Sequence, residues 1–141
     1  MHLQDIIKTT KTLKLLYVED DEISRLSAKE LLANFFTDIT TAVDGGEALE
    51  KFNENDFDII LSDINMPKLN GIDLMHEIRK LDKEVSIVFL TAENEDEYLA
   101  EGAKIGVDSF IIKPLGLNNL TTALTRVSEK ILLKREKELN S

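Results

Sequence analysis

Acidic residues gather directly behind the first apolar segment of the chain. The stretch "LLYVEDDE", residues 15–22, places Glu19 and Asp20 at the end of a run that resembles a buried strand. Two carboxylates about 4 Å apart repel by roughly 4 kcal/mol at an effective dielectric constant of about 20, so a divalent cation would stabilise the cluster. Oxygen ligands without cysteine or histidine nearby favour Mg²⁺, with Mn²⁺ as a substitute, over zinc.

Three further polar side chains end other apolar segments. Asp63 follows "FDIILS", Thr91 lies near the end of "VSIVFLTA", and Lys113 follows "VDSFII". A carboxylate can act as a nucleophile toward phosphorus, and a hydroxyl, an ammonium group and a magnesium ion can hold a phosphoryl group in transfer. These residue types therefore predict phosphoryl chemistry, provided that the fold brings them together.

The elements that must position these residues can be read from the apolar pattern. Five short segments rich in Ile, Val, Leu and Phe are expected to be strands: 13–18, 38–43, 57–62, 85–92 and 107–113. Helical periodicity lies between them and after them, and in the first helix the apolar stripe is expected to comprise Ile23, Leu26, Leu31, Leu32 and Phe35. This alternation predicts an α/β fold, a doubly wound parallel sheet whose ligands bind at the carboxyl ends of the strands.

Composition limits the classes of function. The 141 residues suffice for one ordinary domain, and a net charge of −10 argues against direct binding to nucleic acid or to an anionic membrane. There is no cysteine, and no apolar run approaches the roughly 20 residues needed to span a bilayer. The first residues lack the features of a signal peptide. We therefore expect a cytoplasmic protein.

The motifs in combination resemble a known family. The acidic pair, the D-x-N-M-P sequence at Asp63 with Gly71 eight residues later, T-A-E and K-P are similar to the receiver domain of bacterial two-component response regulators, over about residues 13–128. The resemblance implies a five-stranded sheet with the flavodoxin-like strand order 2-1-3-4-5. Residues 1–12 are then an N-terminal extension, and residues 129–141 an extended C-terminal helix or a linker to an output domain.

The resemblance also assigns roles to the site residues. Asp63 corresponds to the residue that takes a phosphoryl group from a histidine kinase or phosphotransfer protein. The implied Mg²⁺ ligands are Glu19, Asp20, Asp63 and the backbone carbonyl of Asn65. Thr91 and Lys113 correspond to the residues that contact the phosphoryl group. The only departure among the acids is Glu19, where the family often has aspartate.

Further implied roles concern switching and hydrolysis. Phe110 corresponds to an aromatic residue that turns inward when Thr91 moves toward the phosphate. Asn65 and Glu93 occupy positions that tune dephosphorylation, and their polar side chains favour a short-lived phosphorylated state. The resemblance also implies a cis peptide bond before Pro114.

The expected output is a change in partner binding, by an attached output domain or a downstream effector protein. A homodimer through the face formed by the fourth receiver helix, the fifth strand and the fifth receiver helix, or through the C-terminal helix, is also anticipated. At the C-terminus, the positions Leu120, Leu124, Val127 and Ile131 suggest at most a short coiled-coil seam; a frayed, solvated helix end is the alternative.

Three other functions compete with this interpretation. A haloacid-dehalogenase-type phosphohydrolase would also use Asp, Thr and Lys with Mg²⁺, but it needs D-x-D after the first strand, where this chain has "VEDDE". A flavodoxin-like FMN carrier would need a phosphate-binding loop in place of these acids. A receiver-like interaction module that is independent of phosphorylation remains the third alternative.

Overall fold

The computed structural model describes residues 2–66, 69–92 and 96–140. The strands are β1 (Lys14–Val18), β2 (Asp38–Ala42), β3 (Ile59–Asp63), β4 (Ser86–Thr91) and β5 (Ser109–Ile112). The helices are α1 (Leu3–Thr10), α2 (Glu22–Leu32), α3 (Gly45–Glu54), α4 (Gly71–Leu81), α5 (Asp96–Ile105) and α6 (Leu117–Leu139). Within these residues, no helix has both the length and the apolar character required to cross a membrane.

The five strands form one parallel sheet in the order β2-β1-β3-β4-β5. The predicted fold class and strand order are confirmed. Val18 pairs with Ser62 and Asp63 pairs with Leu90, so the carboxyl ends of the three central strands lie in line. The residues that follow these strands therefore meet at one edge of the sheet.

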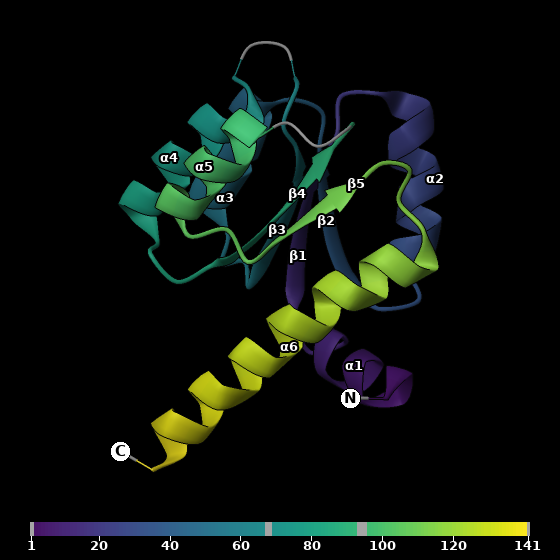
Figure 1. Ribbon diagram of the computed structural model, residues 1–141, viewed down its shortest axis with the longest axis vertical. Helices are drawn as coiled ribbons and strands as arrows, with labels where there is room; N and C mark the ends of the chain where they lie inside the picture. The colour runs from purple at the N-terminus through teal and green to yellow at the C-terminus, as the bar shows by residue number, and fades with distance from the viewer. Residues whose placement is uncertain (1, 67–68, 93–95, 141) are drawn as a thin grey trace.

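Helices cover both faces of the sheet. Figure 1 shows α3, α4 and α5 on one face and α2 and α6 on the other. Alternate residues of β1 point to opposite faces, so Leu15 and Tyr17 belong to the core under α2 and α6, whereas Leu16 and Val18 belong to the core under α3 to α5. Burial of both faces explains why the strands read as continuous apolar runs.

The N-terminal extension forms a helix that packs against α6, and Figure 1 shows this helix at the end of the sheet where the strands begin. Ile6 is 1% exposed and joins the core of that face. The hydroxyl of Thr10 donates to the carbonyl of Phe35 at 2.6 Å, and Arg135 of α6 donates to the Thr12 hydroxyl at 3.1 Å. The extension and the long last helix thus brace each other.

The prediction of a coiled-coil seam on the C-terminal helix is wrong, because the side chains of this seam are not exposed. Leu120, Leu124 and Val127 are buried in the core of their own domain, and Ile131 packs beside them. These side chains have an intramolecular partner, namely the sheet and α1, so they are not available to a second helix.

The predicted apolar stripe of α2 is also wrong in part. Ile23 is 80% exposed and Leu26 is 58% exposed, whereas Ala28, Leu32 and Phe35 are buried. At about 100° per residue, positions 23 and 26 lie roughly 140° and 160° around the helix from position 28. The three buried residues define the face that meets the sheet, and the first two lie on the opposite side.

Candidate functional site

Three carboxylates converge at the carboxyl edge of β1 and β3. Glu19, Asp20 and Asp63 each offer an oxygen atom, and these atoms all lie within 4.8 Å of one another. Glu19 is 2% exposed and Asp63 is 5% exposed, whereas Asp20 is exposed. The sequence prediction that adjacent strand ends would bring these acids together is confirmed.

Lys113 closes the site from the end of β5. Its ammonium nitrogen lies 2.7 Å from Asp63 Oδ2 and 3.7 Å from Glu19 Oε1. Burial lowers the pKa of Lys113, but the hydrogen bond to Asp63 and the charge of that residue outweigh it, so the net shift is upward. Lys113 is therefore held as a cation against the carboxylate that is the candidate phosphoryl acceptor.

One positive charge does not balance three acids. Burial, the hydrogen bond with Asp63 and the charge of Asp63 together raise the pKa of Glu19 to about 8. Its Oε2 atom is buried and has no hydrogen-bond partner among the described residues. A buried carboxylate oxygen without a partner, within an all-oxygen cluster, is the donor set that Mg²⁺ takes. The residues present therefore fit a magnesium ion.

Local sequence holds the acids in place. The side chain of Asp21 accepts a hydrogen bond from the Ser24 backbone N–H at 2.8 Å, which begins α2 directly after the acidic pair. Hydrogen bonding from the side chain of Ser24, and then from its backbone N–H, lowers the pKa of Asp21. Arg25 of that helix donates to the carbonyl of Glu19 at 2.9 Å. The helix cap thus fixes the position where the backbone leaves β1.

Gly71 allows the loop after β3 to return to the site. A Cβ atom at this position would lie 2.5 Å from the carbonyl oxygen of Asp63 and 2.8 Å from Cα of Ile64. The Gly71 N–H donates to the Ile64 carbonyl at 2.8 Å. The glycine at this spacing is required because two backbone segments pass each other without room for a side chain.

The two residues proposed as a switch lie on neighbouring strands. Thr91 ends β4 and is 5% exposed, and its carbonyl accepts from the Lys113 N–H at 2.7 Å. Phe110 is half-buried, and its ring centroid lies 5.9 Å from that of Phe89. A Cβ atom on Gly102 of α5 would lie 2.3 Å from Phe110 Cζ. Phe110 therefore packs directly under α5.

The two residues that the resemblance assigns to dephosphorylation are Asn65 and Glu93. Asn65 is exposed, and its side-chain oxygen accepts a hydrogen bond from the Tyr98 hydroxyl at 3.2 Å. Glu93 lies outside the described residues. The sequence analysis assigned no role to Tyr98, and its contact with Asn65 is seen only in the structure.

The peptide bond between Lys113 and Pro114 is cis, as predicted. The turn that follows is held by Asn119 of α6, whose amide nitrogen donates to the carbonyls of Ile112 and Pro114 at 3.2 and 3.1 Å. Its side-chain oxygen accepts from the Gly116 N–H at 2.8 Å. One side chain thus ties the end of β5 to the start of α6 and orients Lys113.

Residues 15–125 match the model of the response regulator receiver domain. The chain belongs to this family. Its strand order and its cluster of acids agree with that assignment.

Particular relatives place the chain among known receivers. It is 33% identical to the chemotaxis protein CheY of Thermotoga maritima, over 82% of this chain and 98% of that protein. It is also 33% identical to the transcriptional regulatory protein RprY of Bacteroides fragilis, over 96% of this chain but only 57% of that protein. Among solved structures, the response regulator TrrA of Thermotoga maritima in complex with Mg(2+)-BeF has a TM-score of 0.69 and 30% identity, covering 82% of this chain and 98% of that one.

Proposed function

We propose that this chain is a phospho-accepting receiver that takes a phosphoryl group onto Asp63 and changes its partner binding in response. The observation that carries the proposal is the contact of 2.7 Å between the Lys113 ammonium and Asp63, within a cluster of three acids. This arrangement provides a carboxylate nucleophile next to a fixed cation, which is what phosphoryl transfer requires of a protein.

The chemical step is a displacement at phosphorus. An oxygen of Asp63 forms a bond to the phosphorus of a phosphohistidine, and the bond from phosphorus to the imidazole nitrogen breaks with its electron pair left on the imidazole. Lys113 and the hydroxyl of Thr91 hold the oxygens of the transferring group. A magnesium ion held by Glu19, Asp20, Asp63 and the carbonyl of Asn65 would neutralise the charge that develops on those oxygens. Mn²⁺ can substitute in such an oxygen site.

The proposed response lies on the face of α5 and β5. When Thr91 moves toward the new phosphoryl group, Phe110 is expected to turn into the space that Thr91 leaves. Phe110 packs against Gly102 of α5, so a change of its rotamer alters the surface of that helix. Phosphorylation would then shift a pre-existing equilibrium between two surfaces.

The partners follow from the family. A histidine kinase or phosphotransfer protein would donate the phosphoryl group, and an output domain or effector protein would receive the signal. The chain spans 57% of the length of its relative RprY, a transcriptional regulatory protein. An attached output domain is therefore one of the two forms of output that we propose. We expect the protein to act in the cytoplasm and to catalyse only its own phosphorylation and dephosphorylation.

Incubation with Mg²⁺ and acetyl phosphate tests the proposal. Intact mass spectrometry of the wild-type protein should show one added phosphoryl group, which is lost at alkaline pH. The variant Asp63→Asn and a wild-type sample in EDTA should show none. No adduct, with Mg²⁺ binding retained, would contradict autophosphorylation from small donors and would favour the phosphorylation-independent module unless a cognate kinase transfers the group.

A further inference from the structure

The hydroxyl of Tyr98 reaches from α5 to the edge of the acidic site. It donates to the side-chain oxygen of Asn65 at 3.2 Å, and Asn65 is two residues beyond Asp63. The Tyr98 ring packs at the margin of the core under α3 to α5. A half-buried tyrosine with its hydroxyl at a polar site is a fixed donor, because its ring is held by packing.

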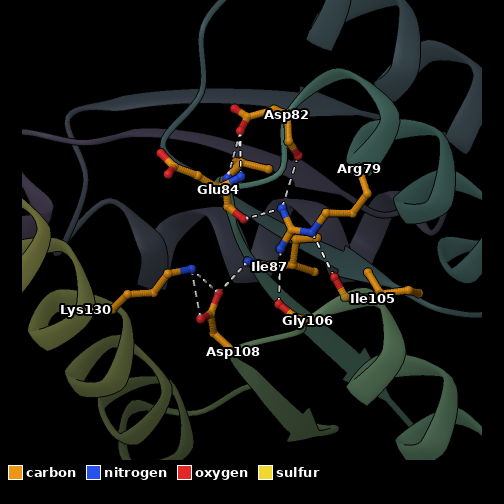
Figure 2. A network of polar contacts seen from close by, with 9 residues as sticks. Arg79, Asp82, Glu84, Ile87, Ile105, Gly106, Asp108 and Lys130 are labelled. Carbon is orange, nitrogen blue, oxygen red and sulfur yellow. Dashed lines mark hydrogen bonds and ion pairs between the residues drawn. The ribbon is translucent and has the colours of Figure 1, made fainter.

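The end of α5 beyond Tyr98 is anchored firmly. Figure 2 shows Arg79 of α4 directed at the backbone around the last turn of α5. Its guanidinium donates to the carbonyls of Ile105 at 2.8 Å and Gly106 at 3.1 Å, and also to the carbonyls of Val85 at 2.8 Å and Asp82 at 3.3 Å. This clamp fixes where α5 ends, so the helix presents Tyr98 to Asn65 from a defined position.

Hydrolysis of an acyl phosphate on Asp63 depends on a positioned water molecule. The water oxygen forms a bond to phosphorus, and the bond from phosphorus to the Asp63 oxygen breaks with its electron pair left on the carboxylate. One water proton passes to solvent, and the other remains on the released phosphate. A side-chain amide near the phosphoryl group orients such a water by accepting a hydrogen bond from it. The Asn65 side chain has one acceptor atom, Oδ1, and the hydrogen bond from Tyr98 takes one of its two lone pairs and fixes the direction in which the amide points.

We propose that Tyr98 is a positioning residue that slows dephosphorylation by holding the Asn65 side-chain oxygen away from the attacking water. The inference rests on the proposed function, because it concerns the fate of the phosphoryl group on Asp63. It adds a residue of α5 to the control of the lifetime of the phosphorylated state, so the position of that helix and the rate of hydrolysis are coupled through the hydrogen bond between Tyr98 and Asn65.

The test compares Tyr98→Phe with the wild-type protein. Both are phosphorylated with acetyl phosphate and Mg²⁺, freed of donor by desalting, and followed by intact mass spectrometry. Loss of one exposed neutral hydrogen bond should shorten the half-life of the adduct by about two- to fivefold. The rate of phosphoryl uptake should not change, because the substitution removes only the hydroxyl group that donates to Asn65.

A double-mutant cycle separates positioning from a structural effect. In an Asn65→Ala background, Tyr98→Phe should leave the half-life unchanged, because the acceptor it controls is gone. An unchanged or longer half-life for Tyr98→Phe in the wild-type background would overturn the inference, as would equal acceleration in both backgrounds. If wild-type protein takes up no phosphoryl group from acetyl phosphate or from a kinase, the proposed function fails and this inference fails with it.

Discussion

The stability of the metal-free protein should fall as pH rises through neutrality, and Glu19 should be the cause. Its pKa is raised from an ordinary 4.5 to about 8, first by burial and then by Asp63. Between these two values the folded protein keeps a proton on Glu19 that the unfolded chain has released. Rising pH therefore favours the unfolded state, and the contribution is complete once the pH passes the folded-state pKa.

The size of the effect follows from the two pKa values. A carboxyl whose pKa moves from 4.5 to about 8 changes the free energy of unfolding by roughly 4–5 kcal/mol. Glu19 shares its interactions with Asp63 and Lys113, so we expect about half of this, roughly 2–3 kcal/mol, between about pH 5 and pH 8. Asp21, which caps the N-terminus of α2, has a lowered pKa. Its contribution has the opposite sign, because that stability is lost as the pH falls, and it is confined to more acidic pH.

Urea unfolding in EDTA, followed by circular dichroism at several pH values, measures this slope. Glu19→Gln should flatten the profile and be more stable than wild type at pH 8. Addition of Mg²⁺ should restore the wild-type stability, most strongly at high pH. A flat or rising profile for wild type in EDTA, or an equal slope in Glu19→Gln, would refute the reasoning.

Two further predictions concern Lys113 and Gly102. Lys113→Met should bind Mg²⁺ about three- to tenfold more tightly than wild type in calorimetric titration, because the ammonium 2.7 Å from Asp63 competes with the metal ion. Lys104→Met, at an exposed position of α5, is the matched control. Equal Mg²⁺ affinities for Lys113→Met and wild type would contradict the prediction. Gly102→Ala should destabilise the protein in urea unfolding, because its Cβ would lie 2.3 Å from Phe110 Cζ. In a Phe110→Ala background the same change should instead stabilise by about 1 kcal/mol through helix propensity, and destabilisation in both backgrounds would count against the contact.

Much of the site could be predicted because it depends on topology. Polar residues at the carboxyl ends of adjacent parallel strands have to meet, so the ends of β1 and β3 predict that Glu19 and Asp63 lie together. Lys113 follows β5, which is two strands away from β3, and only the resemblance to the family assigns it to the site. The sheet was predictable because strands that are buried on both faces require apolar residues at nearly every position, and such continuous runs are visible in the sequence.

Other features depend on details that periodicity does not encode. Ile23 and Leu26 lie in register with one apolar pattern of α2, but the packed face follows another. Tyr98 satisfies an apolar position and a polar contact at once, and periodicity reports only the first. Arg79 resembles a basic residue placed to complement the end of a helix, yet its guanidinium contacts backbone 26 and 27 residues away.

The packing of α1 against α6 gives the two faces of the sheet different mechanical roles. On that face, α1, α2 and α6 share one apolar core with β1 and are joined across 25 residues by Thr10 and across 123 residues by Arg135. On the opposite face, α5 is held by the contact between Gly102 and Phe110, by the hydrogen bond from Tyr98 to Asn65 and by the hydrogen bonds from Arg79 to the carbonyls of Ile105 and Gly106. Opening of α5 breaks these local contacts, whereas opening of α6 disrupts a core that three helices share with β1, so the two helices should belong to units of different local stability. The face of α1, α2 and α6 thus forms a rigid frame, and a small movement of α5 relative to that frame changes the surface of the protein.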